Sequence, residues 1–122
     1  MKVSEMMRQA IAIDVDTSIK DAAKIMSVHK INSLIVLRKE KVIGIITEED
    51  LIKNFGSGNG VSGVMSKNII SIKPDETTNK ARDLIKNNKI GIIPVIENGK
   101  LKGIISAKDL LIEGDSGDFL IE

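Results

Sequence analysis

Two short segments of the chain combine the residue types that could hold a ribose and a phosphate. Gly44 to Asp50 and Gly103 to Asp109 both follow the pattern Gly-apolar-apolar-hydroxyl-x-x-Asp. In each segment an apolar run gives way to polar residues, which indicates a strand that turns into a helix. Amides at a helix start attract phosphate, a Thr or Ser hydroxyl donates to a phosphate oxygen, and a carboxylate accepts from two neighbouring hydroxyls. The pattern therefore indicates a nucleotide-type ligand.

The same residues also have a purely structural explanation. Thr47 with Asp50, and Ser106 with Asp109, have the spacing of helix N-caps. For a single copy of the pattern, capping explains these residues as well as ligand binding does. The presence of two copies in one chain favours the ligand.

Other chemistries find less support in the sequence. The chain has no cysteine, and His29, near the end of an expected helix, is its only histidine. Zinc sites and nucleophile–base pairs therefore lack their usual residues. The carboxylates at residues 14–16 and 48–50 have no further partners in the pattern. Residues 58–63 satisfy G-x-G-x-x-G, but no strand is expected directly before them, so we expect a flexible linker there. We expect no metal site and no catalytic residue.

The two motifs belong to two copies of a larger unit. At an offset of 59 residues, Ile-Ala-Ile at 11–13 aligns with Ile-Ser-Ile at 70–72, Lys30-Ile31 aligns with Lys89-Ile90, and residues 41–51 align with residues 100–110. The register is kept across residues 11 to 52, so chance is a poor explanation. We therefore expect two repeats of one fold.

Periodicity predicts the same elements in each repeat. Capping-type residues at 16–18 and 75–77 precede apolar residues that are spaced along one helical face. Residues 33–37 and 92–96 read as buried strands, and residues 42–46 and 101–105 as strands paired antiparallel with them. The hairpin turn is clearest at Asn98-Gly99. Each repeat is thus β-α-β-β-α, and we expect the two to pack sheet to sheet about a pseudo-twofold axis, because one alone is marginal in size.

Composition limits the partners of the chain. It has 122 residues, with 18 Lys and Arg against 17 Asp and Glu, which leaves a net charge of +1 and no strong field for nucleic acid or an anionic membrane. Phe55 and Phe119 are the only aromatic residues, so there is no stacking platform for bases. No apolar run approaches the roughly 20 residues of a membrane-spanning helix. We expect a soluble, cytoplasmic protein that holds its ligand with backbone and aliphatic groups.

Taken together, the motifs resemble those of the cystathionine-β-synthase (CBS) domain family, whose members occur as tandem pairs. The Gly-to-Asp motif closes each repeat of that family, residues 61–66 are similar to its V-x-x-V-M-T opening, and residues 90–95 are similar to its h-x-x-h-P-V strand. The resemblance extends over residues 3–112. It implies an α/β (α+β) fold with a first repeat at 1–55 and a second repeat at 61–113. The small and polar residues at 56–60 indicate a linker, and the segment at 114–122 is expected to be a tail that serves as a tether or docking strand.

The resemblance also implies a function. CBS pairs hold AMP, ADP, ATP or S-adenosylmethionine in two clefts and assemble as homodimers. A ligand-sensing module of this kind acts on a separate effector protein through a change of conformation, without catalysis. One alternative is a structural dimerisation scaffold in which Asp50 and Asp109 are only caps. An enzyme acting on nucleotide phosphates is a third hypothesis, but the chain lacks a P-loop and a metal cage.

In the family, the aspartate that binds the ribose comes from one repeat, and the residues that contact the adenine come from the other. For the first site this rule implies Thr47, Asp50, Ser66, Asn68, Ile69, Ile70, Ile90, Gly91 and Pro94. For the second site it implies Ser106, Asp109, Arg8, Ala10, Ile11, Ile31 and Asn32. The second match is looser, since Arg8 stands where the family usually has Thr and Ile35 stands where the second repeat has Pro94. If only one site binds a ligand, we expect it to be the first. Candidate cations for a phosphate are Lys67, Arg8, Lys89, Lys108 and His29.

Overall fold

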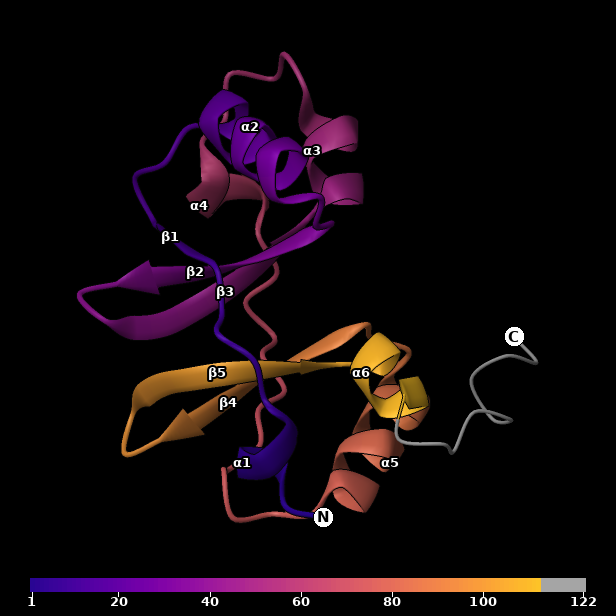
Figure 1. Ribbon diagram of the computed structural model, residues 1–122. Coiled ribbons are helices and arrows are strands. Elements are labelled where there is room, and N and C mark those ends of the chain that lie inside the picture. The colour runs from indigo at the N-terminus through magenta and orange to yellow at the C-terminus, as the bar shows by residue number, and fades with distance from the viewer. Residues whose placement is uncertain (113–122) are drawn as a thin grey trace. The chain divides into compact units, whose positions relative to one another are not determined.

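The elements of the chain follow the order expected for two repeats. A computed structural model describes residues 1–112, so the tail proposed at 114–122 and residue 113 lie outside the described residues. The described helices and strands are α1 (Val3–Met6), β1 (Ala12–Asp14), α2 (Ile19–His29), β2 (Ser33–Arg38), β3 (Lys41–Thr47), α3 (Glu48–Asn54), α4 (Val61–Val64), α5 (Thr78–Asn88), β4 (Ile92–Glu97), β5 (Lys100–Ser106) and α6 (Ala107–Ile112) (Figure 1). The predicted mixed fold with a repeated order of elements is confirmed. The single turns α1 and α4 were not predicted.

The described chain divides into two compact units, each with its own sheet. The unit that we call the Asp50 unit comprises Ile11–Ile69, and the unit that we call the Asp109 unit comprises Met1–Ala10 together with the described chain from Ile70. The first unit contains the sheet β1-β2-β3 and the second contains β4-β5. The predicted boundaries follow the sequence repeats, whereas these units exchange their opening segments. The segment before β1 belongs to the Asp109 unit, and the segment with α4 belongs to the Asp50 unit.

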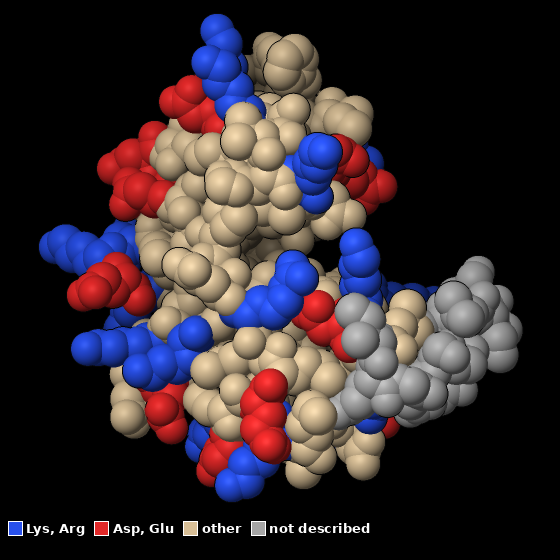
Figure 2. Space-filling model, in the orientation of Figure 1, with Lys and Arg blue, Asp and Glu red and all other residues tan. Residues whose placement is uncertain are grey.

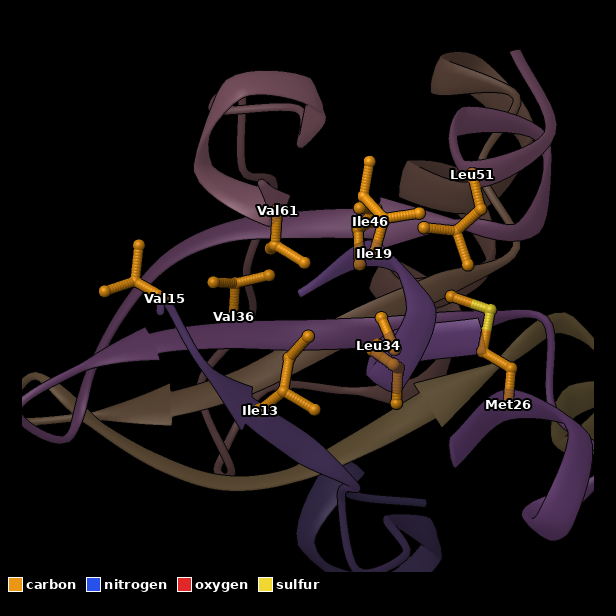
Figure 3. Packing of buried hydrophobic residues seen from close by; sticks show 10 residues of the cluster. Ile13, Val15, Ile19, Met26, Leu34, Val36, Ile46, Leu51 and Val61 are labelled. Carbon is orange, nitrogen blue, oxygen red and sulfur yellow. The ribbon is translucent and has the colours of Figure 1, made fainter. Parts of the chain in front are cut away.

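The buried side chains show how this exchange is stabilised. The core of the Asp50 unit consists of Ile13, Val15, Ile19, Ala22, Met26, Leu34, Val36, Ile46, Leu51 and Val61 (Figure 3). The core of the Asp109 unit consists of Val3, Ile72, Ala81, Ile85, Ile93, Val95, Ile105 and Leu110. Val61 and Val3 are both fully buried, and each comes from the opening segment of the other repeat. Burial of a valine contributes about 1.5–3 kcal/mol, so this side chain is one of the contacts that hold each opening segment in place.

The two longer helices begin at the predicted capping residues. The Ser18 hydroxyl accepts a hydrogen bond from the amide of Asp21 at 3.0 Å, and the Thr77 hydroxyl accepts one from the amide of Lys80 at 3.2 Å. Apolar residues then recur at helical spacing along the faces that enter the two cores. Capping and periodicity therefore act together to fix α2 and α5, as the sequence predicts.

The first strand is well formed only in the Asp50 unit. There β1 pairs in parallel with β2. Beyond the strand ends, the amide of Ile35 donates to the carbonyl of Ile11 at 3.4 Å, and the amide of Val15 donates to the carbonyl of Leu37 at 2.9 Å. These two bonds extend the pairing at its ends.

In the Asp109 unit the predicted first strand is reduced to one bridge, between Ile72 and Val95. The residues that correspond to Ile35 and Val15 are Pro94 and Pro74, the only two prolines of the chain. Proline has no amide hydrogen to donate, so both outer bonds are lost. The two prolines therefore account for the shorter pairing in the second repeat.

The two β-hairpins turn through backbone of the same left-handed conformation. Lys39 and Glu40 have φ angles of 48° and 69°, and Asn98 and Gly99 have φ angles of 52° and 78°. Two central residues with positive φ match the twist of a hairpin, and Asn-Gly is the preferred pair. Lys-Glu adopts the same turn against its intrinsic preference, because a Cβ makes this region unfavourable.

This difference predicts opposite effects of two substitutions. Glu40→Gly removes the unfavourable Cβ and is expected to raise the free energy of unfolding by about 0.5–1 kcal/mol. Gly99→Ala introduces a Cβ at a φ of 78° and is expected to lower it by about 1 kcal/mol. Urea unfolding followed by circular dichroism measures both. A destabilising Glu40→Gly would contradict this account of the first turn.

Candidate ligand-binding site

The first motif is held by a reciprocal pair of hydrogen bonds. The Thr47 amide donates to Asp50 Oδ2 at 2.9 Å, and the Asp50 amide donates to Thr47 Oγ1 at 3.2 Å. The two residues thus form a capping box at the start of α3. This box fixes the orientation of the Asp50 carboxylate. Within the described chain its other oxygen, Oδ1, has no hydrogen bond or ion pair, and the residue is half-buried.

The second motif repeats this geometry at the start of α6. The Ser106 amide donates to Asp109 Oδ2 at 3.2 Å, and the Asp109 amide donates to Ser106 Oγ at 3.1 Å. The structural explanation by helix capping is therefore correct for both motifs. Capping does not exclude ligand binding, because it uses only one oxygen of each carboxylate.

The helix starts themselves offer fewer free amides than the sequence pattern indicates. The amide of Glu48 donates to the carbonyl of Asn32, and the amide of Ala107 donates to the carbonyl of Gly91, both at 2.9 Å. With the capping bonds, two of the first three amides of each helix are engaged inside the unit. Both helices are also short, seven residues in α3 and six described in α6. The aspartate oxygens, rather than the helix amides, are thus the main polar groups that the motifs offer to a ligand.

The glycine of each motif makes room for an opening segment. A Cβ on Gly44 would lie 2.4 Å from Sδ of Met65, and a Cβ on Gly103 would lie 2.6 Å from the carbonyl oxygen of Arg8. These distances are below any normal contact, so neither position tolerates a side chain without movement. The sequence pattern places both glycines in the ligand motif, but it carries no sign of this packing role.

The opening segments then pair with the strands that lead into the motifs. Ser66 exchanges two backbone hydrogen bonds with Ile45, at 2.8 and 3.0 Å. Arg8 exchanges two with Ile104, both at 2.9 Å. Since Ile45 and Ile104 correspond in the two repeats, Ser66 and Arg8 occupy equivalent positions. Each lies beside the strand that ends at the capping Thr or Ser.

The two carboxylates differ in their surroundings. Asp109 Oδ1 lies 3.6 Å from Nη1 of Arg8, and the Asp109 side chain is only 8% exposed, whereas that of Arg8 is 62% exposed. Asp50 has no such partner in the described chain, because the residue equivalent to Arg8 is Ser66. Of the five candidate cations, Arg8 is the one that forms an ion pair with another residue of the described region.

The predicted contact residues divide between the two units. The Asp50 unit holds Thr47, Asp50, Ser66, Asn68 and Ile69 of the first set, and Ile11, Ile31 and Asn32 of the second. The Asp109 unit holds Ile70, Ile90, Gly91 and Pro94 of the first set, and Ser106, Asp109, Arg8 and Ala10 of the second. Within each unit the hydrogen bonds join the motif to its opening segment and to residue 32 or 91. Neither Asn68 nor Ala10 is joined to a motif by a hydrogen bond of the described chain.

The described residues carry few signs of other chemistry. Residues 1–112 contain no group of three His, Asp or Glu side chains placed to hold a metal ion. None of the described helices has the length and apolar character that crossing a bilayer requires. On the face seen in Figure 2, basic and acidic side chains are interspersed, without a large region of one sign.

Comparison with known proteins gives the same repeat structure. The family model of the CBS domain matches residues 3–57 and again residues 61–114. An inosine-5′-monophosphate dehydrogenase from Nitrosopumilus maritimus is 32% identical over 110 residues, which are 88% of this chain and 23% of that protein. An uncharacterised 17.7 kDa protein from Acidianus ambivalens is 37% identical over 100 residues, which are 78% of this chain and 61% of that protein. The chain thus spans less than two thirds of either curated relative.

Solved structures of CBS domains are similar over nearly the whole chain. The CBS domain pair of protein MJ0100, solved in complex with 5′-methylthioadenosine and S-adenosyl-L-methionine, matches with a TM-score of 0.85 and 25% identity, and the match covers 93% of this chain and 94% of that one. The CBS-domain protein ATU1752 from Agrobacterium tumefaciens matches with a TM-score of 0.82 and 31% identity, over 93% and 98% of the two chains.

The close approach at the two glycines predicts a ranked pair of destabilising substitutions. Gly103→Ala is expected to lower the free energy of unfolding by about 2–3 kcal/mol, because the added methyl meets the backbone of Arg8. Gly44→Ala is expected to cost about 1–2 kcal/mol, because its nearest neighbour is the flexible Met65 side chain. Thermal and urea unfolding test the ranking. Gly63→Ala, whose Cβ would meet nothing closer than 3.5 Å, is the control.

Proposed function

Because this chain belongs to the CBS domain family, we propose that it is a regulatory module that binds an adenosine-containing ligand and performs no chemistry itself. The observation that carries this proposal is the geometry of Asp50. One oxygen of its carboxylate is fixed by the Thr47 amide, and the other is unpaired within the described chain. A carboxylate held in this way accepts hydrogen bonds from the two hydroxyls of a ribose without first losing another partner.

The choice of an adenosine ligand is supported by a relative. The CBS pair of MJ0100 was solved with 5′-methylthioadenosine and S-adenosyl-L-methionine. Both molecules carry a ribose and an adenine. The chain is rich in isoleucine at the predicted contact positions, and burial against such side chains contributes about 25 cal/mol per Å² of apolar surface without aromatic stacking. AMP, ADP, ATP and S-adenosylmethionine are therefore the proposed ligands, and the two predicted sets of contact residues are the proposed binding residues.

The role of Asp50 is tested by a substitution that keeps the helix cap. Asp50→Asn retains an oxygen to accept from the Thr47 amide but removes the charge, so the stability of the free protein should change little. Charge-assisted hydrogen bonds contribute about 1.5–3 kcal/mol, so the affinity for the adenosine ligand is expected to fall roughly 10- to 100-fold. Isothermal titration calorimetry measures the affinity.

Glu49→Gln is the matched control for this experiment. It makes the same change of charge at the neighbouring residue. The Glu49 side chain is 76% exposed, and its carboxylate oxygen Oε1 lies 3.9 Å from Nζ of Lys53. The control is expected to bind like the wild type. Unchanged affinity in Asp50→Asn would show that Asp50 is a cap and no more.

Thermal unfolding in the presence of AMP, ADP, ATP, S-adenosylmethionine and 5′-methylthioadenosine separates the regulatory module from the structural scaffold. A ligand at 100 times its Kd is expected to stabilise the fold by about 2.7 kcal/mol. The scaffold predicts no rise in melting temperature with any of them. The proposed regulatory action on a separate protein requires, in addition, that the bound and free conformations differ in their affinity for that partner.

We propose in addition that the chain forms a homodimer through α2 and α3 of the Asp50 unit. Val28 in α2, Ile52 in α3 and Phe55 at the end of α3 are 75%, 71% and 75% exposed, and the two helices contact each other. Large apolar side chains that are this exposed are a common feature of subunit interfaces.

Phe55→Ser is expected to weaken dimerisation at least about tenfold, because a buried phenyl ring contributes about 1.5–3 kcal/mol. Sedimentation equilibrium measures the effect, and Asn87→Ser, at the position in α5 that corresponds to Val28, is the control.

A further inference from the structure

The Asp109 carboxylate has partners for both of its oxygens. Oδ2 accepts from the Ser106 amide at 3.2 Å, and Oδ1 lies 3.6 Å from the Arg8 guanidinium. The carboxylate is 8% exposed, while the arginine is 62% exposed. The buried partner is thus fixed in place, and the exposed one is free to take other positions.

The Asp50 carboxylate is the internal comparison. It has the same capping bond, from the Thr47 amide at 2.9 Å, but at the position equivalent to Arg8 it has Ser66. A serine side chain is neutral and much shorter than an arginine. The two motifs are therefore alike in backbone and in capping, and they differ in whether a cation from the opening segment neutralises the aspartate.

This difference affects what each aspartate can accept. A ribose hydroxyl that binds Asp109 Oδ1 competes with the guanidinium, which lies 3.6 Å from the same oxygen of a carboxylate that is only 8% exposed. A neutral nucleoside gives the displaced arginine no new partner. A ligand that carries a phosphate does, because guanidinium groups bind phosphate oxygens through two parallel hydrogen bonds.

We infer that Arg8 is a selectivity residue, which closes the Asp109 unit to neutral adenosine ligands and admits those with an anionic group that takes over the guanidinium. This inference rests on the proposed function, since it concerns the same ligand class. It makes the two motifs unequal sensors: the Asp50 motif accepts neutral and anionic adenosine ligands, and the Asp109 motif accepts anionic ones.

The substitution Arg8→Ser tests this inference with little risk to the fold. The backbone of residue 8 exchanges two hydrogen bonds with Ile104, and these do not depend on the side chain. Serine is the residue that occupies the equivalent position 66. The background is Asp50→Asn, which weakens the Asp50 motif so that binding at the Asp109 motif can be followed by itself. The probes are 5′-methylthioadenosine, which is neutral, and AMP, and binding is followed by the backbone amide signals of residues 103–112 in two-dimensional NMR.

In the Asp50→Asn background, Arg8→Ser is expected to raise the affinity for 5′-methylthioadenosine about tenfold and to reduce the preference for AMP over 5′-methylthioadenosine at least as much. Arg8→Lys keeps the charge and is expected to bind 5′-methylthioadenosine as weakly as the Asp50→Asn background. The mirror variant Ser66→Arg, made with Asp109→Asn, is expected to weaken 5′-methylthioadenosine binding at the Asp50 motif about tenfold.

Equal affinity for 5′-methylthioadenosine with and without Arg8 overturns the inference, as does an Arg8→Lys variant that behaves like Arg8→Ser. In either case the proposed function stands, because the wild type still binds adenosine ligands through Asp50. If neither probe shifts the backbone amide signals of residues 44–54 or of residues 103–112 in the wild type, the proposed function itself fails, and the inference fails with it.

Discussion

Two glycines that cannot carry a side chain determine how this chain is assembled. At Gly44 and Gly103 the backbone or the methionine of an opening segment lies so close that an added Cβ would be 2.4 or 2.6 Å from its nearest neighbour. This contact allows each opening segment to pair with a strand of the other repeat. Val61 and Val3 then enter cores that their own repeats do not supply. The exchange of segments therefore depends on the absence of two methyl groups.

The same contact gives the ligand motifs their polar surroundings. Each opening segment places residue 66 or residue 8 beside the strand that leads into the motif, and Arg8 lies 3.6 Å from the aspartate that ends its motif. The aspartate is itself oriented by a capping bond, and the helix amides are largely engaged. Capping and binding are therefore compatible roles of a single side chain, because a carboxylate has two oxygens and a cap uses one. What differs between the repeats is the partner of the second oxygen.

The two prolines show how a repeat diverges without losing its fold. Pro74 and Pro94 replace the two residues whose amides extend the pairing of the first strand in the Asp50 unit. The remaining bonds through Ile72 still hold the segment at its place in the sheet. Arg8 is a second divergence of the same kind, since its backbone pairing is kept and its side chain is different. In both cases the backbone preserves the architecture while single side chains change the local chemistry.

The sequence by itself determined the elements, because their signals are local. The capping residues Ser18 and Thr77, the helical spacing that follows them, and the alternation of apolar strands with polar turns act over a few residues, and the structure confirms them. The 59-residue offset also determined that the fold occurs twice. Only the tertiary structure decided which repeat each opening segment joins. It also showed that the motif glycines leave room for these segments, where a side chain would collide. It alone also paired Arg8 with Asp109. These features arise from contacts between residues that are about 20 to 100 positions apart, where neither periodicity nor spacing carries information.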